Sequence, residues 1–227
     1  MTVALVLFTF ITFLLIDHFH SKKNVVVQPA MQVAPRATVA AARPTPSLVA
    51  GFQVPENLRF HPGHTWALSE SPSLVRVGMD DFASKLAGPV QSITLPQRGQ
   101  WIRQGQKLCT LHRDGVAVDM VSPIEGSVSD INEILRQTPE LTAKDPYGEG
   151  WMVTVQSPDA KTNFRNLLGG ALARWWAEES ASRLRAKLPT LSAMPAMAQD
   201  GGVAIDNVSS QIPDKEWGTL TREFFLS

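Results

Sequence analysis

The sequence predicts a mainly β domain with small helices, preceded by an apolar N-terminal helix and followed by a helical extension. Three observations indicate this fold class. Short apolar runs separated by turn residues fill residues 53–157, a texture typical of β-sandwiches and barrels. Residues 1–16 carry no charged side chain. Apolar side chains recur at helical spacing after residue 158.

Composition and charge exclude two classes of protein. The 227 residues are enough for one domain with terminal segments. The 21 Lys and Arg residues are balanced by 21 Asp and Glu residues, so the chain lacks the positive charge with which proteins neutralise nucleic-acid phosphates. Cys109 is the only cysteine, which excludes an intrachain disulfide and a zinc site built from cysteines.

The N-terminal segment, residues 1–20, predicts a membrane helix. At ~1.5 Å per residue its uncharged run covers about 24 Å, slightly less than a bilayer core. A signal peptide would carry a basic residue before the run, whereas Lys22 and Lys23 follow it. By the positive-inside rule, this pattern predicts a single-pass N-terminal anchor in the inner (cytoplasmic) membrane, with the domain facing the cytoplasm.

A tether is predicted over residues 21–52. This stretch lacks acidic residues and shows no sustained hydrophobic period. Its prolines disfavour a helix and bias the chain toward extended conformations. The tether is therefore expected to separate the domain from the membrane and to carry no functional site.

The β domain is predicted over residues 53–157. Asp114 and Gly115 lie between two alternating runs, which is the strongest local indication of a tight β-hairpin. Short helices are expected over residues 80–86, which begin with two acids, and near residues 138–141, where a proline follows a threonine. The predicted strands are residues 65–70, 74–79, 90–95, 107–112, 116–122, 126–132 and 151–156.

The C-terminal extension is predicted as an amphipathic helix over residues 158–188, then a linker and helical tail over residues 189–227. The tail helix starts at Pro213 and repeats apolar residues at helical spacing. The first helix packs either on the β domain and tail or, alternatively, on a partner or membrane surface. Its apolar stripe is Phe164, Leu167, Leu168, Ala171, Leu172, Trp175, Trp176 and Leu184, and its cations are Arg174, Arg183, Arg185 and Lys187.

A series of motifs in residues 64–155 resembles one known family. The most specific motif is DPYGEGW at residues 145–151. The others are HTWA (64–67), the segment VRVGMDDFASKLAGPVQSITLPQRGQWIRQGQKL (75–108), SPIEG (122–126), INEIL (131–135) and TPEL (138–141). On these motifs the chain resembles the H protein of the glycine cleavage system, in the biotinyl/lipoyl superfamily. The resemblance implies a lipoyl-type barrel-sandwich (hammerhead) fold.

The family's working residue is a lysine at the tip of a β-hairpin, in a short E-S-x-K-A setting that the lipoyl ligase recognises. Aligned backward from residues 122–123 without a gap, that setting falls on residues 112–116. The lysine position then falls on Gly115, in the turn formed by Arg113, Asp114 and Gly115. Because lipoate is attached through an amide to an ε-amine, a glycine cannot carry it. The resemblance therefore implies a family member without the cofactor.

No other lysine is predicted to replace the missing one. Lys107 lies at the far end of the strand that leads to the turn, and Lys85 and Lys144 belong to other segments. None of the three is predicted on a projecting turn. His112 stands where the family has its glutamate.

Other residues capable of chemistry have structural explanations. His61 and His64 have a spacing used by metal ligands, but no third ligand is specified, so we predict no metal site. Cys109 lies in a predicted strand, where a buried thiol is the usual finding. Asp80 and Asp81 open a helix, where acids are favoured by the helix dipole. We predict no catalytic residues, no small-molecule substrate and therefore no enzyme.

The predicted function is that of a membrane-tethered, H-protein-like module that is not lipoylated and acts as a binding or assembly subunit. Its expected partners are the membrane and proteins, either glycine cleavage enzymes or another membrane-associated complex. Two alternatives stay open. One is a genuine glycine cleavage system H protein that shuttles the aminomethyl group. The other is a membrane-fusion type export adaptor, although in those chains a long helical hairpin usually splits the lipoyl-like domain.

Overall fold

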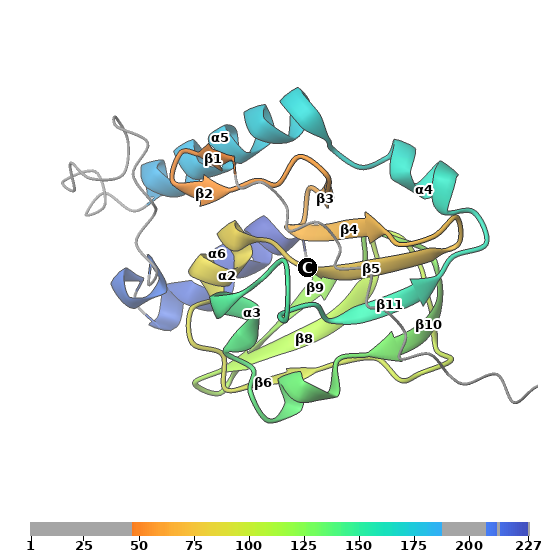
Figure 1. The fold of residues 1–227 in the computed structure, drawn as a ribbon. Coiled ribbons are helices and arrows are strands. Elements are labelled where there is room, and N and C mark those ends of the chain that lie inside the picture. Colours follow the sequence, from red (N-terminus) through yellow and green to blue (C-terminus); the bar gives the residue numbers. More distant parts are fainter. Residues whose placement is uncertain (1–46, 188–207, 213, 227) are drawn as a thin grey trace, which may run out of the picture. The chain divides into compact units, whose positions relative to one another are not determined.

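The computed structural model describes residues 47–187, 208–212 and 214–226. The predicted anchor, residues 1–20, lies outside the described residues, and so does the predicted tether as far as residue 46. The described residues belong to one unit of the chain, which spans Arg43–Ser227. Figure 1 shows its strands and helices.

The predicted location at the inner membrane is corrected by the structure. Helix α5 (Gly170–Lys187) carries charged side chains along its length. In the part of the chain that the structure describes, no helix has the length and the apolar character needed to cross a bilayer. On this finding we withdraw the inner membrane as the predicted location of the protein.

Two larger sheets and one small ribbon form the β domain, and all strand pairs are antiparallel. The six-stranded sheet has the order β3 (Arg59–His61), β4 (Thr65–Ser69), β5 (Leu74–Met79), β11 (Val153–Gln156), β10 (Gly126–Ile131) and β7 (Trp101–Ile102). The three-stranded sheet has the order β6 (Ser92–Thr94), β8 (Lys107–Arg113) and β9 (Val116–Val121). The ribbon pairs β1 (Leu48–Val49) with β2 (Phe52–Gln53).

Both larger sheets contribute side chains to the larger of two hydrophobic clusters. Val75 and Val77 of β5 are fully buried, because alternate residues of a strand point to the same face. Leu111 of β8 and Val118 and Met120 of β9 enter the same cluster from the other sheet. The shared core fixes the β8–β9 pair against the six-stranded sheet.

The mainly β prediction is confirmed. Each predicted strand overlaps an observed one, namely β4, β5, β6, β8, β9, β10 and β11, and only β8 extends past its predicted range, by one residue. The strands β1, β2, β3 and β7 have only two or three residues each, too few to show an alternating pattern in the sequence.

Helix α2 (Asp81–Ala87) forms where the sequence predicts a helix. Asp80 caps it, since its Oδ1 accepts a hydrogen bond of 2.7 Å from the backbone N–H of Ala83. All residues of α2 are buried. Lys85 tolerates this burial because its Nζ lies 2.9 Å from Oδ2 of Asp81.

The structure divides the helix predicted over residues 158–188 into α4 (Ala160–Arg165) and α5. Between them the backbone of Leu168 pairs with that of Phe60, with hydrogen bonds of 2.9 and 2.8 Å. Gly170 then adopts a positive φ of 56°, which favours glycine. This pairing with β3 interrupts the helix.

The remaining helices are short or C-terminal. The 3₁₀ turn η1 (Glu133–Arg136) and α3 (Leu141–Lys144) follow β10. After the undescribed residues 188–207 come the 3₁₀ turn η4 (Val208–Gln211) and α6 (Asp214–Phe225). Helix α6 confirms the predicted tail helix and packs against β9 and α2.

Candidate functional site

The β8–β9 hairpin ends in a two-residue turn at Asp114 and Gly115. Arg113 pairs with Val116 directly across the turn, and the φ angles of Asp114 and Gly115 are 49° and 78°. A positive φ at both central residues is typical of the type I′ turn, whose twist matches that of the flanking strands. The predicted hairpin is therefore confirmed, with the turn at the predicted residues.

Side chains from two neighbouring segments brace this turn. Asp114 receives a 3.0 Å hydrogen bond from Nε2 of Gln91 and donates its backbone N–H to Oε1 of the same glutamine, at 3.3 Å. Nε of Arg113 lies 3.1 Å from Oδ2 of Asp114, and its Nη1 donates to the carbonyl of Ala87, also at 3.1 Å. These bonds hold the turn in one conformation.

The tip itself is open to solvent. A Cβ added at Gly115 would meet no atom within 4 Å, and the side chain of Asp114 is 52% exposed. The position thus offers room for a side chain, although Gly115 supplies none.

The lysines that the sequence singles out lie away from the tip. Lys107 starts β8, and its Nζ forms a 2.8 Å ion pair with Oδ1 of Asp119. Lys85 is buried in α2, and Lys144 ends α3. None of these three side chains stands on the turn.

His112 lies on the outer face of the three-stranded sheet. Its Nε2 lies 2.8 Å from Oγ1 of Thr94 on β6. It borders a shallow hollow that also includes Arg222 of α6. The other lining residues are Thr94, Lys107, Thr110, Ala117 and Asp119.

The two histidines with metal-ligand spacing have separate structural roles. Nδ1 of His61 accepts a 3.0 Å hydrogen bond from the backbone N–H of Gly63. His64 is fully buried, with its Nδ1 2.8 Å from Oδ2 of Asp80. Its ring stacks on Phe82 at 4.2 Å. Among the described residues, no group of three or more His, Cys, Asp or Glu side chains is arranged to hold a metal ion.

The single thiol is buried and neutral. Sγ of Cys109 lies 3.7 Å from Sδ of Met152, and the side chain is 1% exposed. Burial, with a smaller effect of Asp119, raises the pKa of Cys109 to about 12. Because the thiolate is the reactive form, Cys109 is an inert core residue at neutral pH.

Helix α6 covers one side of the hairpin. A Cβ added at Gly218 would lie 2.9 Å from Cγ1 of Val116, so the helix approaches the strand closely. Nη2 of Arg222 donates to the carbonyl of Ala117 on β9, at 3.2 Å. The sequence shows that α6 is amphipathic, but no local pattern reveals that the hairpin is its packing partner.

Two sheets that share one core, with a protruding type I′ hairpin, define a small β domain of the lipoyl/biotinyl type. The family model described as "Glycine cleavage H-protein" matches residues 58–175. The chain belongs to the glycine cleavage H-protein family. The matched residues include the hairpin and end within α5, so α6 lies outside them.

Curated relatives support this assignment. The chain is 32% identical over 128 residues to a glycine cleavage system H protein of Anaeromyxobacter sp. (strain K), a match that covers 56% of this chain and 98% of that protein. It is 36% identical over 108 residues to the H protein of Coprothermobacter proteolyticus, covering 48% of this chain and 85% of the relative. A crystal structure of the H protein from Mycobacterium marinum is 22% identical, with a TM-score of 0.47, over 56% of this chain and 98% of that one.

Glycine cleavage H proteins are non-catalytic lipoyl carriers. The prediction that this chain is not an enzyme is therefore confirmed by its family.

Proposed function

We propose that this chain is a glycine cleavage H-protein family member that does not carry lipoate and acts as a binding or assembly subunit. The observation that carries the proposal is the hairpin turn of Asp114 and Gly115, where the family resemblance puts the carrier lysine. The hairpin keeps its shape, since Asp and Gly alone form a type I′ turn. It lacks the amine on which lipoylation depends.

Lipoate does not fit the residues at this turn. Its attachment requires an ε-amine, and Gly115 has no side chain. The open space around Gly115 would admit a lysine, so the missing residue rather than crowding prevents attachment. We therefore assign no step of this protein's function to lipoate.

The geometry of the other lysines supports the proposal. Lys85 is 6% exposed and paired with Asp81, so a ligase cannot reach its amine. Lys107 is 59% exposed but lies at the opposite end of β8 from the turn, in an ion pair with Asp119. An arm that visits several active sites needs a protruding attachment point, and neither lysine provides one.

A binding role agrees with two features of the structure, the intact core of the β domain and the additional C-terminal helix α6. The β domain retains its core, and α6 adds new surface beside the hairpin. The partners we propose are proteins, either glycine cleavage enzymes or the members of a different complex. The distinction is testable by cross-linking the full-length chain in its native cells and identifying the co-purified proteins.

Intact-mass spectrometry of the full-length chain from its native cells tests the absence of lipoate. We expect the unmodified mass. A lipoyl or octanoyl adduct on any lysine would overturn the proposal. The authentic H protein of the same cells, if present, serves as the positive control because it should carry the adduct.

The alternative function is that of a genuine H protein, which family membership favours. Complementation of an H-protein deletion with glycine as nitrogen source separates the two. We expect no growth with this chain and growth with an authentic H protein. Growth with this chain would establish the carrier function and reject our proposal.

A further inference from the structure

Helix α5 presents two large apolar side chains, Leu172 and Trp175, to solvent, whereas Trp176 and Leu184 of the same helix pack against the core. Leu172 and Trp175 are 54% and 62% exposed. On the opposite face Ala173, Ala177 and Ala181 are buried. The hydrophobic effect alone would bury the large side chains, because the free energy gained grows with the apolar area removed from water. The arrangement leaves a tryptophan and a leucine one helical turn apart on the surface.

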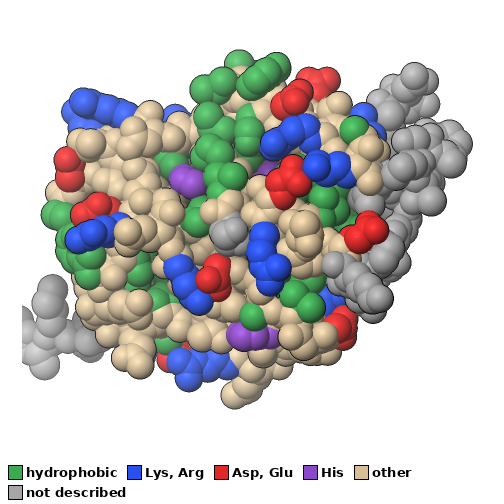
Figure 2. Space-filling model, turned by 180° about the vertical axis from the view of Figure 1, so that it is seen from behind, with side chains coloured by type: hydrophobic (Ala, Val, Ile, Leu, Met, Phe, Trp, Pro, Cys, Tyr) green, Lys and Arg blue, Asp and Glu red, His purple; other side chains and the backbone are tan. Residues whose placement is uncertain are grey.

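These two residues belong to a continuous surface. Residues three or four apart on a helix are neighbours, so the exposed stripe continues along α5. We define the α5 outer face as Leu172, Trp175, Glu178, Glu179 and Ser182, all of which are exposed. Figure 2 shows hydrophobic side chains gathered at the top of the molecule, where α5 lies, with charged side chains beside them.

The α5 outer face is acidic. Among the described residues, neither Glu178 nor Glu179 has an ion-pair partner. The cations of the same helix are largely engaged elsewhere: Arg174 bonds Glu56 at 2.6 Å and Lys187 bonds Glu223 at 2.9 Å. Arg183 lies over the ring of Phe224, 5.2 Å from its centroid. Three of the four cations of α5 therefore contact other elements, and Arg185 is the exception.

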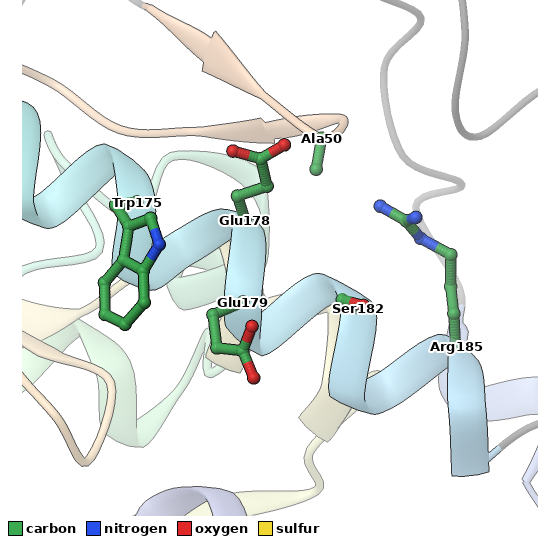
Figure 3. A pocket seen from close by; sticks show the side chains of 6 residues that line it. All are labelled: Ala50, Trp175, Glu178, Glu179, Ser182 and Arg185. Carbon is green, nitrogen blue, oxygen red and sulfur yellow. The ribbon is translucent and has the colours of Figure 1, made fainter.

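A hollow of about 520 Å³ runs along this face and reaches Ala50, in the turn of the β1–β2 ribbon. In Figure 3, Glu178 points toward Ala50 of the ribbon, while Trp175 and Glu179 lie on the other side of the helix axis. Arg185 closes the far end. With two carboxylates and one guanidinium, the hollow has a net negative charge.

We propose that the α5 outer face is a docking surface for a basic segment of a protein partner, one that presents an apolar side chain next to Lys or Arg. This inference rests on the proposed function and specifies the surface through which the subunit binds. Tryptophan is enriched among the residues that dominate binding energy, so Trp175 is the anchor. Glu178 and Glu179 supply the charge complementarity that selects a basic partner. Glu178, Glu179 and Ser182 lie outside the residues that the family model matches, which end at residue 175.

The test uses nuclear magnetic resonance of the full-length, ¹⁵N-labelled chain. The probes are two model peptides with the same amphipathic helical pattern, one of Lys and Leu and the other of Glu and Leu. We expect the Lys/Leu peptide to shift the indole N–H signal of Trp175 and the Glu/Leu peptide to leave it unchanged. Trp101 on β7 is the matched control, because it is 51% exposed but lies on a different element.

Variants sharpen the test. Trp175→Ala and the double substitution Glu178→Lys with Glu179→Lys should each weaken binding of the Lys/Leu peptide by about tenfold or more. The charge reversal should also create binding of the Glu/Leu peptide. Trp101→Ala should change neither. These side chains are exposed, so the circular dichroism spectra of all variants should match that of the parent chain.

Several outcomes would overturn the proposal. Equal shifts with both peptides would show apolar adhesion without selection by charge, and equal shifts of Trp101 and Trp175 would show adhesion without a site. A Trp175 signal that moves with protein concentration alone would identify a second copy of the chain as the occupant. A lipoyl adduct would overturn the proposed function only. A chain without an adduct that does not bind the Lys/Leu peptide would overturn the docking surface only.

Discussion

The guanidinium of Arg113 lies over the indole ring of Trp217, 5.3 Å from its centroid. Arg113 is the last residue of β8, and Trp217 belongs to α6, so the contact links the hairpin to the C-terminal helix. Trp217 also donates its Nε1–H to the carbonyl of Leu86 in α2, at 3.2 Å. One tryptophan thus joins three elements that are far apart in the sequence.

A double-mutant cycle with Arg113→Ala and Trp217→Ala tests this link. We expect a coupling free energy of about 0.5–2 kcal/mol in urea unfolding, because a partly desolvated cation–π contact has that magnitude. Arg98→Ala combined with Trp217→Ala is the control, since Arg98 pairs with Asp130 instead. Additive effects in the first pair would show that the two side chains do not interact.

Two glycines should respond differently to replacement by alanine. A Cβ at Gly126 would lie 2.4 Å from the carbonyl oxygen of Gln156, which is backbone and cannot move aside cheaply. We expect Gly126→Ala to lower the free energy of unfolding by roughly 2–4 kcal/mol. A Cβ at Gly115 meets no atom within 4 Å. Gly115→Ala should therefore lower the free energy of unfolding by only about 1 kcal/mol, the cost of placing alanine at a positive φ of 78°. The measurement is the free energy of unfolding of both variants, in thermal and urea unfolding. Equal losses for Gly126→Ala and Gly115→Ala would contradict this account.

Acid should destabilise the fold through His61. Burial, and secondarily the nearby His64, lower the pKa of His61 below its ordinary value of 6.5. The unfolded chain therefore binds the proton first, and the free energy of unfolding decreases as the pH falls below about 6.5. The His61→Asn variant keeps an acceptor for the N–H of Gly63 and should show a shallower loss. Parallel pH profiles for the two proteins would exclude this role of His61.

Cys109 should be protected from thiol reagents in the folded protein. Because its thiol is buried and neutral, we expect labelling at pH 8 to be at least about a thousandfold slower than in denaturant. Cys109→Ala, with no other cysteine in the chain, should give no labelling at all. Rapid labelling of the native protein would mean that the core around Met152 opens locally.

Features set by short-range patterns were predictable from the sequence. The turn at Asp114 and Gly115, the start of α2 at Asp80 and the alternating strands each depend on a few neighbouring residues. The family motifs likewise identified the domain and the position of Gly115 in its hairpin. In these segments local preference and tertiary structure agree.

Features set by distant contacts were not predictable. The pairing of Leu168 with Phe60 splits one expected helix into two, and no local sequence pattern predicts this pairing. Helical spacing grouped Leu172 and Trp175 with Leu184, but only Leu184 of these three is buried, because tertiary packing decides which side of α5 faces the core. The contact between His64 and Asp80 likewise depends on how β4 meets α2.

The seat of α6 on β9 has a consequence for solubility. Among the described strands, β9 pairs with β8 alone, so its other edge would present unpaired backbone groups. Such edges template the addition of strands from other molecules, which leads to aggregation. Arg222 donates a hydrogen bond to the carbonyl of Ala117, and α6 packs against the strand. The C-terminal helix therefore protects the hairpin from intermolecular β-pairing.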